Sequence, residues 1–184
     1  DMSPGLPMFA IVGLPDAAVK ESKERVRAAV KNTGFNFPIR KITVNLAPAD
    51  IKKEGSGFDL PMALGILAAE EVIKAEALRR YLVVGELSLD GRIKPIKGAL
   101  SIAVAARDAR FGGLILPSEN ATEAAVVQDL MVYGVETLPQ VVEFLNGALK
   151  IEPTSVNLDG LFSQPGVYVE DFAEVKGQDH AKRA

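Results

Sequence analysis

Residues 55–69 read Gly-Ser-Gly-Phe-Asp-Leu-Pro-Met-Ala-Leu-Gly-Ile-Leu-Ala-Ala, a glycine-rich turn followed by a segment that is apolar on nearly every side. The apolar pattern continues to Val72 and predicts a helix over residues 59–72. A helix without a polar face has to be covered all round, so it belongs in the centre of a domain. We therefore expect the remaining segments to pack around it.

The segments on either side of this helix alternate between strand and helix patterns. Before it, we expect a buried strand at 8–12, an amphipathic helix from its cap at Asp16 to Asn32, and a half-buried strand at 42–46. After it, we expect strands at 81–84, 114–116 and 130–135, a hairpin at 87–93 that turns at Asp90-Gly91, and helices at 98–109, 119–127 and 138–145. In the helix at 98–109, the inward residues are expected to be Leu100, Val104 and Ala105. This order predicts an α/β (α+β) fold with helices packed on a mixed sheet.

Composition excludes several classes of protein. The 184 residues include no cysteine and one histidine, His180, which excludes disulfides and the usual zinc sites. No apolar run approaches the roughly 20 residues that span a bilayer, and no leader pattern is present, so we expect a cytoplasmic protein with no membrane partner. The motif Gly-x-x-x-x-Gly-Lys-Ser/Thr is absent, so these residues should not hydrolyse ATP by themselves.

Ser56 lies on the glycine-flanked turn before the central helix, where backbone amides could hold an oxyanion. A serine-lysine peptidase would also need a desolvated lysine as its base, and Lys94 and Lys97 are the candidates. The alternative is that the glycines allow a tight turn and that Ser56 or Asp59 caps the helix. We favour this second interpretation.

Three carboxylates, Glu54, Asp59 and Glu86, could act as an acid and base pair if the fold brought them together. Asp59 precedes an apolar helix and is most simply its N-cap, where its charge favours the helix dipole. Carboxylate spacing alone is weak support for a metal site, so we predict neither catalytic residues nor a metal.

Residues 20–41 carry seven basic residues and two acidic ones, although the whole chain has a formal charge of −3. Contacts from Lys and Arg to phosphates dominate sequence-independent binding to nucleic acids, so this segment could form a local DNA-binding face. The candidate residues are Arg25, Arg27, Lys31, Arg40 and Lys41. The alternative is a solvated helix face with ion pairs such as Glu21 with Arg25, and we weigh it above DNA binding.

Several runs of sequence resemble one family. They are Ser3–Pro7, Val12–Ser22, Thr43–Asp50, Glu54–Pro61, Gly85–Leu87, Asp90-Gly91 and Leu116-Pro117. Together they are similar to the N-terminal domain of the magnesium-chelatase-like AAA+ ATPases of the ComM/YifB type, over most of residues 3–147. That domain resembles the Lon peptidase domain, so the resemblance implies a Lon-like fold related to domain 2 of ribosomal small-subunit protein five.

The same resemblance bears on catalysis. Residues 52–61 and 85–98 are similar to the two halves of the Lon serine-lysine site, but the nucleophile position corresponds to Gly57 and the lysine position to Leu100. Neither residue can react. The resemblance thus implies a non-catalytic domain that serves ring assembly, as a hexamer, and DNA handling in recombination and transformation. A residual peptidase using Ser56 and a magnesium-chelatase subunit are the alternatives.

The resemblance also divides the chain. We expect a Lon-like domain at 1–147, which in the family is preceded by one or two more strands, a linker at 148–170, and the beginning of an AAA+ module at 171–184. In that module Val175, Gly177 and Gln178 would lie near adenine. ATP and magnesium are therefore expected for a longer ATPase and no cofactor for this part of it, whose own status as an enzyme stays open.

Overall fold

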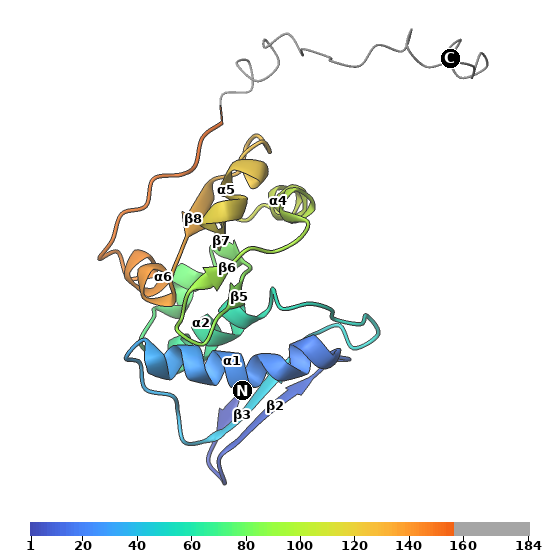
Figure 1. Ribbon diagram of the computed structural model, residues 1–184, viewed down its shortest axis with the longest axis vertical. Helices are drawn as coiled ribbons and strands as arrows, with labels where there is room; N and C mark the ends of the chain where they lie inside the picture. Colours follow the sequence, from blue (N-terminus) through green and yellow to red (C-terminus); the bar gives the residue numbers. More distant parts are fainter. Residues whose placement is uncertain (157–184) are drawn as a thin grey trace, which may run out of the picture.

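The computed structural model describes residues 1–156, which form three small sheets and six helices (Figure 1). The strands are β1 (Met2–Ser3), β2 (Met8–Val12), β3 (Lys41–Asn45), β4 (Tyr81–Val83), β5 (Glu86–Leu87), β6 (Ile93–Lys94), β7 (Gly113–Pro117) and β8 (Val132–Val135). The helices are α1 (Ala17–Asn32), α2 (Asp59–Ala69), α3 (Ala75–Leu78), α4 (Ala99–Asp108), α5 (Ser118–Ala124) and α6 (Leu138–Leu145). The predicted α/β class is confirmed, with the strands divided among separate sheets.

The first sheet has the order β1-β3-β2 and is mixed, because β1 runs antiparallel and β2 parallel to β3. Phe9 of β2 lies opposite Ile42 of β3, and both are buried in the core shared with α1 and α2. Met8 and Val12 are exposed, so β2 is buried on one face and not on both as its apolar run predicted. In Figure 1 this sheet lies below α1.

The second sheet is parallel, with the order β4-β7-β8, and helices cover both of its faces. Ile115 of β7 belongs to the core shared with α2 and α6, while its neighbours Leu114 and Leu116 pack with α4 and α5. Every residue of β7 is buried, as expected for a parallel strand between two helical layers.

The inward face of α4 differs from the prediction. Ala99, Ala103 and Ala106 are fully buried against the second sheet, whereas Leu100 is 44% exposed and Ala105 is exposed. Val104 is half-buried. Small side chains let the helix lie close to the sheet, and the i, i+4, i+7 spacing of the alanines defines the buried stripe.

Other boundaries shift by a few residues. Helix α2 ends at Ala69, before the positive φ of Glu71, and β1 and α3 were not predicted. The hairpin β5-β6 turns through Leu89-Asp90-Gly91, flanked by the backbone pair Ser88 and Arg92, and of the two residues Asp90 and Gly91 only Gly91 has a positive φ. This is a three-residue loop and not the predicted two-residue turn.

The central contact of the molecule joins α1 to α2. Arg25 Nε donates to Asp59 Oδ2 at 2.7 Å and its Nη2 donates to Oδ1 at 3.1 Å. Asp59 is 0% exposed and also accepts from the backbone N–H of Leu87 in β5. This hydrogen-bonded carboxylate raises the pKa of Arg25 above its ordinary value. The predicted capping role of Asp59 is wrong, because the residue before α2 is Phe58 and no side chain caps this helix.

Residues 146–156 follow α6 and complete the part of the chain that the structure describes. The first residues of the predicted linker run back along the domain, since Thr154 N–H donates to the carbonyl of Val132 at 2.8 Å and Ile151 packs against the core. The remainder of the linker and the predicted AAA+ segment lie outside the described residues. No helix among residues 1–156 is long and apolar enough to cross a membrane.

Replacing Arg25 by Met should destabilise the fold, because it leaves the buried Asp59 carboxylate without a cation. We expect the free energy of unfolding to fall by about 3 kcal/mol, in line with breaking one side of a buried ion pair. Chemical denaturation at pH 7 measures this change. Glu21→Gln is the matched control, since Glu21 is exposed and 3.9 Å from the same guanidinium, and it should change stability by less than about 0.5 kcal/mol. Equal losses in the two variants would contradict the assigned role of Asp59.

Candidate functional site

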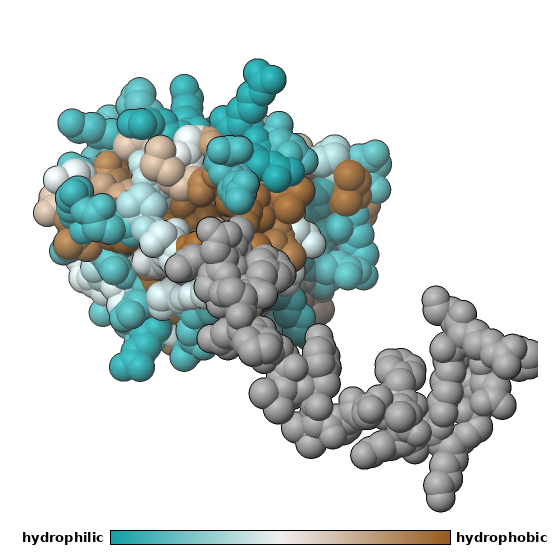
Figure 2. All heavy atoms as spheres, turned by 90° about the horizontal axis from the view of Figure 1, so that it is seen from above, coloured by the Kyte–Doolittle hydropathy of each residue, from teal (hydrophilic) through white to brown (hydrophobic). Residues whose placement is uncertain are grey.

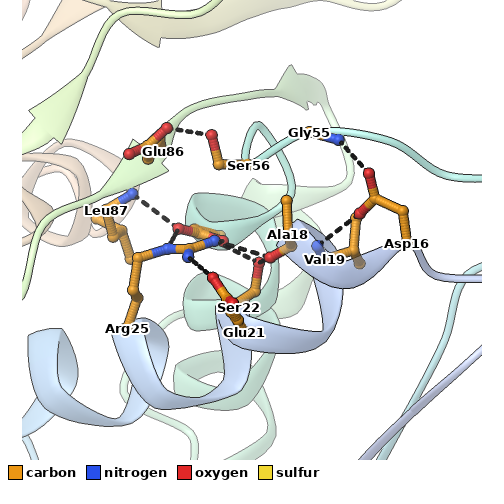
Figure 3. A network of polar contacts seen from close by, with 11 residues as sticks. Asp16, Ala18, Val19, Glu21, Ser22, Arg25, Gly55, Ser56, Glu86 and Leu87 are labelled. Carbon is orange, nitrogen blue, oxygen red and sulfur yellow. Dashed lines mark hydrogen bonds and ion pairs between the residues drawn. The ribbon is translucent and has the colours of Figure 1, made fainter.

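An apolar pocket of about 680 Å³ lies where the two halves of the Lon-like sequence pattern meet. One wall is the loop 54–58 with Pro61 of α2, the second is β4 with Val84 and Glu86, and the third is residues 95–97 with Ile102 of α4. We call this the 56–86 pocket, after the Ser56 and Glu86 side chains that line it. Figure 3 shows its polar end and the hydrogen bonds that hold the loop.

Hydrogen bonds from two parts of the domain hold the loop 54–58 in place. Asp16, the predicted cap of α1, accepts from Val19 N–H at 2.8 Å and from Gly55 N–H at 3.4 Å. The first of these bonds lowers the pKa of Asp16 below its usual range. On the other side, Gly85 N–H donates to the carbonyl of Gly57, and Leu60 N–H donates to that of Gly85. The loop is thus attached to α1 and to the strand segment after β4.

Lys53 fixes the approach to this loop. It is 7% exposed, and its ammonium donates to the carbonyl oxygens of Pro48 and Ile51. Its backbone bridges to Pro15. These hydrogen bonds stabilise the conformation of the segment before the loop. The sequence did not indicate this role of Lys53.

The hydroxyl of Ser56 donates to Glu86 Oε2 (Figure 3). The partner of Ser56 is therefore a carboxylate. Of the two lysines considered as its base, Lys97 lines the pocket and is exposed, and Lys94 is exposed and not among the lining residues. Neither has the buried, desolvated environment that a lysine base requires.

Gly57 and Leu100, the positions that the Lon resemblance implied for the nucleophile and the lysine, lie in different surroundings. Gly57 lines the 56–86 pocket, and a Cβ atom built on it would lie 3.7 Å from Cγ2 of Ile96. Leu100 is on the exposed side of α4 and is not among the lining residues, while its N–H donates to Glu123 at 3.1 Å. A lysine at position 100 would be hydrated in this structure.

Sequence reasoning missed Asn120, which shapes the third wall of the pocket. This α5 residue is 8% exposed, accepts from Ile96 N–H at 2.9 Å and donates to the Ile96 carbonyl at 3.0 Å. Both backbone groups of Ile96 are thereby satisfied without a strand partner. No local sequence signal links positions 24 residues apart in this way.

The three carboxylates considered above have separate partners. Glu54 pairs with Lys52 at 2.7 Å, Asp59 with Arg25, and Glu86 with Ser56. Among the described residues, no group of three metal-ligating side chains is close enough to hold a metal ion.

Three of the five predicted DNA-binding residues come together on a second surface, and a fourth follows one of them in the sequence. Arg27, Lys31 and Arg40 line a hollow of about 140 Å³, and Lys41 is the neighbouring exposed residue at the start of β3. We call this surface the basic hollow. Arg27 lies over the ring of Phe37, 5.4 Å from its centroid, and its Nε is buried without a hydrogen-bond partner among the described residues. Arg25 points instead into the α1-α2 contact.

Two phenylalanines near the basic hollow pack against the core. Phe35 and Phe37 are half-buried and pack against the core, with the Phe37 ring 5.9 Å from that of Phe9. The guanidinium of Arg27 therefore lies against an aromatic ring, whereas the side chains of Lys31 and Arg40 are exposed. The adenine-side candidates Val175, Gly177 and Gln178 lie outside the described residues.

Residues 1–120 match the family described as Subunit ChlI of Mg-chelatase. The chain belongs to this ChlI family. Competence protein ComM of Haemophilus influenzae is 42% identical over the whole chain, which covers 36% of that protein. Protein YifB of Salmonella typhimurium is 40% identical over 99% of the chain, which covers 35% of it. The predicted membership of the magnesium-chelatase-like ComM/YifB group is confirmed.

A more distant similarity concerns the fold of this ChlI-family domain. Lon protease of Azorhizobium caulinodans is 26% identical over 85% of the chain, which spans 19% of that protein. The domain has a Lon-like fold, as the resemblance implied. In this fold the 56–86 pocket holds Gly57 and Ser56, and its polar end is the Ser56–Glu86 pair.

The bond network of the loop gives a pH-dependent prediction. Because the folded-state pKa of Asp16 is lowered, its charged form stabilises the fold above pH 3.8 and this contribution is lost as the pH falls through the folded pKa. Asp16→Ala should therefore lower the urea midpoint at pH 7, and the difference from the unmodified chain should shrink at acid pH. Asp50→Ala, at an exposed position near the same loop, is the control. A difference that is independent of pH would refute a role for the charge.

Proposed function

We propose that this domain is a non-hydrolytic Lon-like domain of a longer, ring-forming AAA+ ATPase in the cytoplasm, where it serves assembly and DNA handling. One observation carries the first half of the proposal. By the correspondence that the Lon resemblance implies, the nucleophile position is Gly57, which lines the 56–86 pocket, and the lysine position is Leu100, which is exposed. A serine-lysine mechanism needs a hydroxyl and a desolvated amine, and neither is supplied by these residues.

The longer protein enters the proposal through the relatives. The chain spans 36% of the length of ComM and 35% of that of YifB. We propose that the remainder is an AAA+ module that binds ATP and magnesium, starts near residue 171 with Val175, Gly177 and Gln178 at the adenine, and assembles as a hexamer. We do not propose a chelatase role for this domain. One relative that matches the whole chain is named for competence.

The basic hollow supports the DNA-handling part. It gathers Arg27, Lys31 and Arg40 beside Lys41, drawn from α1 and from the segment that leads into β3. Such a cluster binds phosphates without reading sequence. Arg25 is left out of the proposed contacts, because its guanidinium is committed to Asp59, Ser22 and the carbonyl of Ala18.

A residual peptidase remains the second candidate, supported by the position of Ser56 in a pocket that Lys97 also lines. We expect no cleavage of an unfolded, fluorescently labelled polypeptide by the chain, nor by Ser56→Ala. Ser101→Ala, at an exposed hydroxyl on α4, is the matched control. Cleavage that Ser56→Ala abolishes and Ser101→Ala retains would overturn the non-hydrolytic proposal.

DNA binding is tested by removing charge from the basic hollow. The triple variant Lys31→Gln, Arg40→Gln, Lys41→Gln should bind a duplex more weakly at low salt, and the slope of log K against log salt should become shallower by about 0.9 for each phosphate that the variant no longer neutralises. Fluorescence anisotropy over a salt series measures both quantities. The control Lys74→Gln, Arg79→Gln, Lys94→Gln removes the same charge from exposed residues elsewhere. Equal reductions in the two triple variants would refute a local site.

A further inference from the structure

The 56–86 pocket opens at the free edge of a sheet. Strand β4 pairs with β7 on one side and has no second strand partner among the described residues. Val83 packs into the core on the α2 side, whereas Leu82 and Val84 pack on the α4 side, and all three line the pocket. A pocket that touches side chains from both faces of a strand lies at the edge of that strand.

The backbone of β4 can accept another strand at this edge. Val84 N–H donates to Ile115 at 3.1 Å, and the Arg80 carbonyl accepts from Gly112 at 2.8 Å, so the even-numbered residues direct their backbone groups toward β7. Because these groups alternate along a strand, those of Tyr81 and Val83 face away from β7. An unpaired edge of this kind is a template for an extended chain.

The walls indicate the composition of that chain. Phe58, Pro61, Pro95 and Ile102 provide apolar surface on both sides of the edge, which suits apolar side chains. At the polar end, Oε2 of the half-buried Glu86 accepts a hydrogen bond from the Ser56 hydroxyl. Glu54 at the rim is already paired with Lys52 at 2.7 Å, and Lys97 lines the pocket and is exposed. The carboxylate of Glu86 therefore complements a basic side chain at this end of the pocket.

We propose that the 56–86 pocket captures an extended polypeptide segment by adding it to the edge of β4, with an apolar side chain in the pocket and a lysine or arginine at Glu86. Nothing in this step is covalent, so Gly57 and the exposed Leu100 do not prevent it. The binding is independent of the basic hollow, which lies on α1 and the segment before β3.

The test uses the 184-residue chain and a fluorescein-labelled peptide, Ala-Val-Lys-Val-Lys-Val-Ala-Ser. Anisotropy should detect saturable binding, and NMR should move the amide signals of Tyr81 and Val83. A peptide with alternate backbone amides methylated should not bind, because it cannot complete a ladder. No binding at millimolar peptide, or undiminished binding of the methylated peptide, would overturn the proposal.

Two variants locate the site. Gly57→Leu should weaken binding at least about tenfold by filling the pocket, since its Cβ points across to Ile96 without a clash. Gly65→Leu is the matched control on α2, where a Cβ meets open space, and it should bind normally. Unfolding midpoints report whether each variant folds, and the amide shifts of the unmodified chain remain decisive if Gly57→Leu does not. Equal effects of the two variants would contradict the assignment.

Glu86→Gln tests the preference for charge. It keeps a side chain that can bond with Ser56 and removes the negative charge, so it should weaken binding of the lysine peptide about tenfold, as expected when a charge-assisted hydrogen bond is removed. Binding of the same peptide with glutamine in place of lysine should not change. If Glu86→Gln affects both peptides equally, the proposed basic selectivity is wrong.

Discussion

A buried charge needs a partner, and this requirement organises the domain. Asp59 has no exposed surface and receives hydrogen bonds from Arg25 of α1 and from the backbone of β5. An unpaired carboxylate in this position would cost several kcal/mol, so α1, α2 and β5 have to meet in one arrangement. The loop 54–58 and Glu86 lie directly beside the residues so fixed, and the geometry of the 56–86 pocket depends on them.

Much of the fold could be predicted from local patterns, and the failures have a common cause. The bounds of β2 and α6 follow from periodicity and end signals, and Asp16 caps α1 as expected. The partner of Asp59, the clamp of Asn120 on Ile96 and the outward position of Leu100 depend on residues far away in the chain. On the face seen in Figure 2, apolar side chains lie among hydrophilic ones. Periodicity identifies an apolar stripe but does not say which stripe a small-residue helix buries.

The sequence predicted more of the basic hollow than of the 56–86 pocket. Three of the five predicted basic residues gather at one surface because they lie on α1 and on the segment leading into β3. Ser56 was found as a residue of interest, but its carboxylate partner was not, since no pattern links positions 30 residues apart. Fold and chemistry are separate questions here, because a Lon-like fold can hold a pocket without the reactive groups of a peptidase.

Helix α1 is attached to the rest of the domain at three levels. Its first turn is bound to the loop at Gly55 through Asp16, its middle to α2 through Arg25, and its last turn to the hairpin, where Asn32 donates to the Leu89 carbonyl at 2.8 Å. Gly91 approaches Thr33 so closely that a Cβ there would lie 2.1 Å from a methyl carbon. A helix attached at both ends and in the middle cannot shift without moving the segments bound to it. The basic hollow and the loop of the 56–86 pocket therefore share one supporting helix.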